Sequence, residues 1–122
     1  MAEKLVEIQV LDRPNGNGCT YPRDTVLASI TGQPVRGKIG MPEGTEWLRW
    51  DASKMSHEVT GLRVEGDQLV GTVRTLDTKL GRKVAVNLDT YDFRIAGYAD
   101  VSDDGVIRDL KIHSINAVLD GA

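Results

Sequence analysis

The chain has 122 residues, of which 40% are hydrophobic and 27% charged, and it carries a net charge of −3 with an isoelectric point near 5.3. This length predicts a single domain, residues 1–122, that buries roughly two-thirds of its unfolded surface without disulfides or metals. The composition excludes a membrane span, because no apolar run approaches the roughly 20 residues that one needs. Lysines and arginines are scattered along the chain, which argues against a nucleic-acid partner.

The N-terminal segment does not resemble a secretory signal, because Glu3, Glu7 and Gln9 interrupt its apolar residues. We therefore expect synthesis in the cytoplasm. Cys19 is the single cysteine, so it forms no internal disulfide and has no second cysteine with which to hold a metal. We assign it no role.

The first third of the chain predicts one strand and one helix. Residues 5–11 alternate apolar and polar side chains with period two, which is typical of a half-buried strand. Residues 12–20 are rich in Pro, Asn and Gly and predict a loop. Pro22 suits a first helical turn, and the spacing of Val26, Leu27 and Ile30 predicts a short amphipathic helix that ends near Gly32.

The remainder predicts two hairpins separated by a helix. Residues 57–76 indicate two strands folded about a turn at 65–67, and residues 79–88 place three apolar side chains on one helical face. Residues 92–101 and 106–119 predict two further antiparallel strands joined by a turn at 102–105. The expected fold class is α+β, with a small, mostly antiparallel, curved or barrel-like sheet and two short helices.

Six short motifs follow one another in an informative order. They are NGCTYP (17–22), GKIGMP (37–42), Ser-His at 56–57 ahead of the first hairpin, LDTKLG (76–81), IAGYAD (95–100) and NAV (116–118). Together these motifs resemble those of the prohead maturation proteases of tailed phages, serine proteases related to the herpesvirus assemblins. The resemblance spans nearly the whole chain and implies a prohead-protease-like fold.

The same resemblance implies that the catalytic residues have been lost. In that family the histidine of the His-Pro motif looks like the general base, and Met41 occupies the corresponding position here. The family's nucleophilic serine corresponds to Ala96 or, if the alignment shifts by one residue, to Gly97. The Ser-His histidine, a supporting partner in the family, corresponds to His57. Acyl transfer needs an activated hydroxyl or thiol beside a base, so the resemblance implies a catalytically degenerate member that is not an enzyme.

Other uses of the two histidines are weaker hypotheses. His57 is retained, and a lone histidine at the head of a strand is more often a hydrogen-bonded structural residue. A rebuilt triad of His57, His113 and Ser102 has no supporting motif. The spacing of His57, His113 and Cys19 matches no known zinc pattern, so we expect neither a metal nor a cofactor.

Residues 43–55 concentrate large apolar side chains between two of the motifs. Trp47, Leu48, Trp50 and Met55 are the candidates for an interface, because tryptophan is enriched at binding hot spots. The alternative is that both tryptophans cover an edge of the core.

The family context suggests a virion structural protein, most simply a capsid decoration or cement protein. Its expected partner is the major capsid protein, with further copies of the chain itself as a second expected partner, and its expected location is the capsid after synthesis in the host cytoplasm. This step rests on analogy, because a fold does not determine a function. Two alternatives stay open: an active prohead maturation serine protease with a relocated site, and an internal regulator of capsid assembly that acts with the scaffold.

Overall fold

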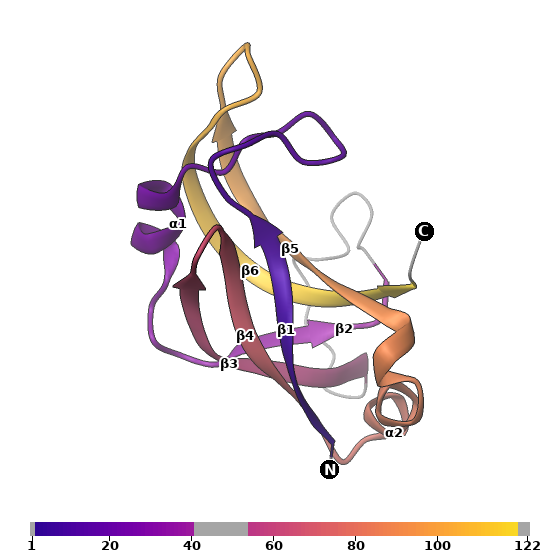
Figure 1. Cartoon of the computed structure of the whole chain (residues 1–122). Helices are drawn as coiled ribbons and strands as arrows, with labels where there is room; N and C mark the ends of the chain where they lie inside the picture. The colour runs from indigo at the N-terminus through magenta and orange to yellow at the C-terminus, as the bar shows by residue number, and fades with distance from the viewer. Residues whose placement is uncertain (1, 41–53, 120–122) are drawn as a thin grey trace.

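The computed structural model describes residues 2–40 and 54–119, and these form two sheets and two short helices (Figure 1). One sheet has four strands in the order β1-β4-β3-β2, all antiparallel, and the other is the antiparallel pair β5-β6. The elements are β1 (Glu3–Val10), α1 (Arg23–Ser29), β2 (Val35–Lys38), β3 (Met55–Glu65), β4 (Gln68–Thr75), α2 (Lys79–Val86), the 3₁₀ turn η3 (Leu88–Thr90), β5 (Tyr91–Val101) and β6 (Ile107–Leu119). The predicted α+β class with two helices and mostly antiparallel strands is confirmed.

The hairpin β3–β4 is the centre of the larger sheet, and its turn lies where the sequence predicts it. Gly66 has φ +60°, a conformation that glycine adopts at little steric cost, and Glu65 pairs with Gln68 across the turn. Val59 and Val73 are paired and fully buried, which places one face of the hairpin in the core.

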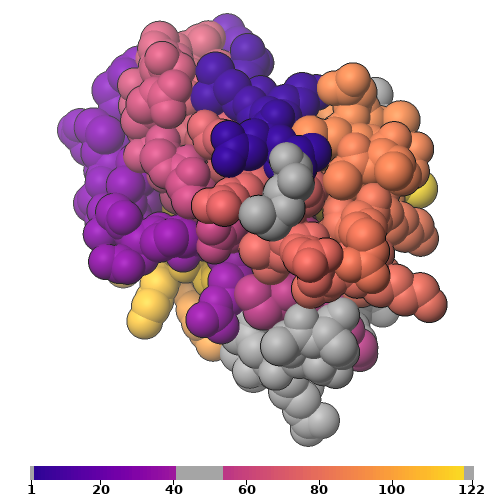
Figure 2. All heavy atoms as spheres, turned by 90° about the horizontal axis from the view of Figure 1, so that it is seen from below, coloured from indigo at the N-terminus to yellow at the C-terminus, as the bar shows by residue number. Residues whose placement is uncertain are grey.

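Strand β1 begins two residues before the predicted strand, ends one residue before its predicted end and pairs with β4. Val6 and Ile8 are buried, as the alternation predicts, although the register shifts between Glu7 and Gln9. Seen from below, the start of β1 lies between the hairpin and the segment that carries α2 and β5 (Figure 2).

Strand β2 was not predicted. Its four residues are too few to show a period-two pattern, and it exists because it pairs with the much longer β3. The predicted helices are present, with α1 burying Val26 but leaving Leu27 47% exposed. Helix α2 ends at Val86, before the predicted limit, and Leu88 belongs to η3 instead. In the ranges 2–40 and 54–119 no helix is long and apolar enough to cross a membrane.

The β5–β6 ribbon curves across the larger sheet and then projects beyond it (Figure 1). Phe93, Ile115 and Ala117 are buried in the core that the two sheets share. The alternation predicted for β5 is wrong after Ile95, because Ala96 is buried and residues 97–101 are all exposed. The cause is that this half of β5 extends past the larger sheet, so that neither of its faces is covered.

The two sheets are joined by hydrogen bonds between β2 and β6, a junction we call the β2–β6 seam. The Gly40 amide donates to the Ala117 carbonyl over 2.7 Å, and Ile39 forms an isolated parallel bridge with Ala117. The Lys38 amide donates to the Asn116 side-chain oxygen over 3.2 Å. The seam therefore fixes the end of β2 against the C-terminal part of β6.

The N-cap of α2 provides a test of how this helix is attached. The Thr78 hydroxyl accepts from the Gly81 amide over 2.9 Å and donates to the Met55 carbonyl of β3 over 2.8 Å. Thr78→Ala loses both bonds and should lower the free energy of unfolding by about 1–2 kcal/mol, measured by urea denaturation. Thr78→Ser keeps the hydroxyl and is the matched control; equal losses from the two variants would contradict this role.

Candidate functional site

His57 lies at the centre of the described site, fully buried between the two sheets. It stands in β3, opposite Thr75 of β4. Its Nδ1 is 2.7 Å from the Ser56 hydroxyl, and its Nε2 is 2.7 Å from the Ile115 carbonyl of β6. The ring also meets Phe93 of β5 edge to face, with ring centroids 5.1 Å apart. One imidazole thus contacts β6 and β5 from a strand of the other sheet.

The absence of a side chain at Gly37 of β2 allows the His57 ring to reach β6. A Cβ atom at position 37 would overlap both the Ile115 carbonyl oxygen and the imidazole of His57. The glycine therefore leaves the space through which the ring crosses β2 to reach β6. The Gly37 carbonyl also lies 3.5 Å from the Ser56 hydroxyl, so all three strands meet at this point.

The hydrogen bond to Ile115 places a proton on Nε2 of His57, because a carbonyl can only accept. In the neutral ring Nδ1 then accepts from the Ser56 hydroxyl. Burial lowers the pKa of His57 below its ordinary value, and the bond to the Ile115 backbone opposes this shift in part. Both ring nitrogens are satisfied without a charge.

The two positions that the resemblance equates with the nucleophile differ in what they can hold. Ala96 is buried and pairs with Ser114 of β6. A Cβ at Gly97 would overlap the Lys111 carbonyl of the neighbouring strand, so a side chain at position 97 requires the backbone to move. On this backbone position 97 has no room for a side chain, whereas position 96 already carries one.

Ser114 was missed by the sequence analysis. Because residues paired directly across two strands share a face, its side chain lies on the same face of the ribbon as Ala96. It is 2% exposed. No local motif marks it, since its place beside Ala96 follows from a register that is shifted between Ala96 and Gly97.

Most of the other predicted residues fall outside the described part of the chain. Met41, Trp47, Leu48 and Trp50 lie in 41–53, which the structure does not describe. Met55, the remaining interface candidate, is the first residue of β3, is half-buried and pairs with Lys38.

The structure separates Ser102 from His57, two members of the hypothetical rebuilt triad. Ser102 lies in the β5–β6 turn, where its hydroxyl accepts from the Val106 amide and bonds to Asp104. His57 contacts β6 eight residues beyond Ile107, which corresponds to about 25 Å along a strand. Within residues 2–40 and 54–119, no three His, Cys, Asp or Glu side chains are grouped so that they could hold a metal.

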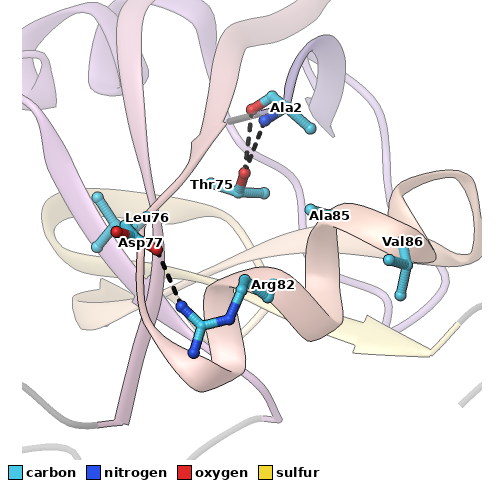
Figure 3. A pocket seen from close by; sticks show the side chains of 7 residues that line it. All are labelled: Ala2, Thr75, Leu76, Asp77, Arg82, Ala85 and Val86. Atoms are coloured by element: carbon cyan, nitrogen blue, oxygen red, sulfur yellow. Dashed lines mark hydrogen bonds and ion pairs between the residues drawn. The ribbon is translucent and has the colours of Figure 1, made fainter.

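A separate hollow of about 530 Å³ lies where β4 ends beside α2 (Figure 3). Arg82 and Asp77 form an ion pair of 2.9 Å at its rim, and the Thr75 hydroxyl exchanges hydrogen bonds with the backbone of Ala2. Leu76, Ala85 and Val86 supply its apolar lining. This hollow contains none of the positions that the resemblance equates with catalytic residues.

The sequence matches no protein-family model and no curated protein. The structure is similar to that of the bacteriophage T4 capsid assembly protease, gp21, with a TM-score of 0.70 over 95% of this chain and 80% of that one. The chain has a prohead-protease-like fold. At 16% sequence identity the similarity concerns the fold alone, and the expectation of such a fold is confirmed.

The close contact between Gly97 and the β6 backbone leads to a prediction about stability. Gly97→Ala should lower the free energy of unfolding by about 2 kcal/mol, because the added methyl group overlaps the β6 backbone. Gly16→Ala is the control, since a Cβ there meets nothing within 4 Å, and it should change stability by less than about 0.5 kcal/mol. Urea denaturation of both variants makes the comparison, and an unaltered Gly97→Ala variant would contradict the packing described.

Proposed function

We propose that this protein is a non-enzymatic phage virion protein, a capsid decoration or cement protein built on a prohead-protease-like fold. The observation that carries the proposal is the absence of a hydroxyl at the nucleophile position: Ala96 has none, and Gly97 has no room for one. The similarity to a capsid assembly protease supports a place beside capsid subunits.

The Ser56–His57 hydrogen bond does not supply an alternative nucleophile. A nucleophile must reach the carbonyl carbon of a substrate, and both side chains are fully buried. Nε2 of His57 is already used in joining β3 to β6, and Nδ1 is bonded to the adjacent Ser56 hydroxyl. This pair is better explained as a structural connection than as a catalytic dyad.

A relocated active site remains the second candidate, because one observation favours it. The Ser114 hydroxyl stands beside the Ala96 position, on the same face of the ribbon. Ser114 is only 2% exposed, so this hydroxyl could act as a nucleophile only after a local opening that admits a substrate. The proposed function therefore requires that Ser114 is unreactive.

The purified protein should neither cleave a phage scaffold protein nor react with a serine-directed fluorophosphonate. Mass spectrometry of the intact protein measures the label, and Ser114→Ala is the control that identifies its site. Stoichiometric labelling that disappears in this variant would establish the relocated protease and exclude the proposed function. Met41→His combined with Ala96→Ser should not create activity, because catalysis also needs preorganised oxyanion donors.

Capsid binding is predicted to depend on the two tryptophans of residues 43–55. A few desolvated anchors carry most of the binding energy in a small interface, each contributing on the order of 2 kcal/mol. The variant Trp47→Ala/Trp50→Ala should stay folded and lose co-sedimentation with expanded capsids. Val86→Ala is the matched control, because it removes an apolar side chain that is 78% exposed on α2.

Each alternative outcome of this experiment has a distinct meaning. A folded double variant that still binds capsids would show that the interface lies elsewhere. Global unfolding of the variant would show that the two tryptophans belong to the core. The decoration role also requires the protein in mature virions, which mass spectrometry of purified particles detects. Its presence only in immature heads would instead indicate a regulator of assembly.

A further inference from the structure

One hydrogen bond beside the β2–β6 seam can be changed by a proton. Among the described residues, two bonds join the end of β2 to β6, from the Gly40 amide to Ala117 and from the Lys38 amide to Asn116, and a third joins β3 to β6 next to them, from the His57 ring to Ile115. The first two involve groups that do not titrate near neutral pH. The third comes from an imidazole that reaches β6 across the bare backbone of Gly37.

The described surroundings of the ring suit its neutral form. Within residues 2–40 and 54–119, the groups that contact it or pair with it in the sheet are Gly37, Phe93, Ile115, Ser56 and Thr75, and none of these carries a negative charge. Protonation at Nδ1 would turn an acceptor into a donor facing the Ser56 hydroxyl. That hydroxyl would then have to turn its proton toward the Gly37 carbonyl, at the longer distance of 3.5 Å.

Charged residues stand close to these positions along the sequence. The burial of the ring is not shared by these charged neighbours, each of which is partly or fully exposed, so their charges are solvated. Among the described residues these neighbours are Arg36 and Lys38 on β2, Glu58 on β3, Arg74 on β4, and Asp92 and Arg94 on β5. On β6, Ile115 stands between Ser114 and Asn116, with the second histidine, His113, two residues before it.

We propose that His57 is a proton-controlled latch beside the β2–β6 seam: by bonding β3 to β6 past Gly37 it keeps the end of β2 against β6 while the ring is neutral, and it lets that end separate when the ring is protonated. The released state is a local opening in which β2 separates from Ile115 and Ala117 and water reaches the imidazole. The β3–β4 hairpin and its core face stay folded in that state. This inference concerns the fold and is independent of the proposed capsid role.

The direction of the pH effect follows from the lowered pKa of buried His57. In the open state the ring regains an ordinary pKa of about 6.5 and binds a proton that the closed state does not. The closed state is therefore favoured above this value and loses its advantage as the pH falls below it. If the closed ring stays neutral, the opening constant rises about 30-fold between pH 7.5 and pH 5.

Native-state hydrogen exchange tests the latch on the intact protein. After correction for intrinsic rates, exchange of the Gly40 and Lys38 amides should accelerate about 30-fold between pH 7.5 and pH 5 and should respond little to low denaturant. Amides of β3 and β4 should remain more protected at both pH values. Acceleration of the seam only together with β3 and β4 would show global unfolding and overturn the proposal, as would an unchanged seam.

Three variants identify the group that titrates. His57→Gln should abolish the pH response, whereas Ser56→Ala should weaken the seam and keep the response, because the closed ring still lacks a negative partner. His113→Gln should also keep it. If His57→Gln does not fold, NMR titration of the His57 ring in the unaltered protein decides the question: the Nε2–H tautomer should persist well below pH 6.5, and titration at the ordinary pKa would overturn the latch.

Discussion

The absence of a side chain at Gly37 is the constraint on which the junction of the two sheets depends. Any Cβ there would occupy the space between the His57 ring and the Ile115 carbonyl. With that space open, a residue of the four-stranded sheet donates directly to the backbone of the β5–β6 ribbon. The bond is buried, so losing one partner would leave the other unsatisfied at a cost of about 1–3 kcal/mol. Position 37 is thus determined by packing.

This dependence explains how a protease-like fold and protease chemistry can be separated. The fold rests on strand pairing, on burial of residues such as Val59, Val73 and Ile115, and on the close approach at Gly37. None of these needs a hydroxyl at position 96, where a methyl group is buried instead. A chain can therefore keep this architecture with or without a hydroxyl at position 96, and fold similarity at 16% identity does not decide the activity.

The sequence predicts what depends on local pattern and misses what depends on contacts between distant segments. The β3–β4 hairpin and α2 carry their own turn, cap and periodicity, so they were predictable. Strand β2 owes its existence to β3, and the exposure of residues 97–101 depends on where the larger sheet ends. Ser114 becomes a candidate only through its register with Ala96. The order of the motifs predicted the fold, whereas the geometry around His57 required the tertiary structure.

The two lines along which the sheets meet differ in chemistry, and this difference bears on how the molecule opens. At β1 and β5 the contact is made by apolar side chains of the shared core, among them Val6, Ile8 and Phe93, and by the exposed ion pair of Lys4 with Asp89. Apolar packing of this kind is non-directional and tolerates small displacements, and an exposed ion pair contributes little. Among the described residues, the end of β2 is joined to β6 by directional hydrogen bonds, the strand itself pairs with β3, and the His57–Ile115 bond joins β3 to β6 beside it. The opening that we propose breaks these directional bonds to β6 and leaves the apolar core between β1, β4 and β5 intact.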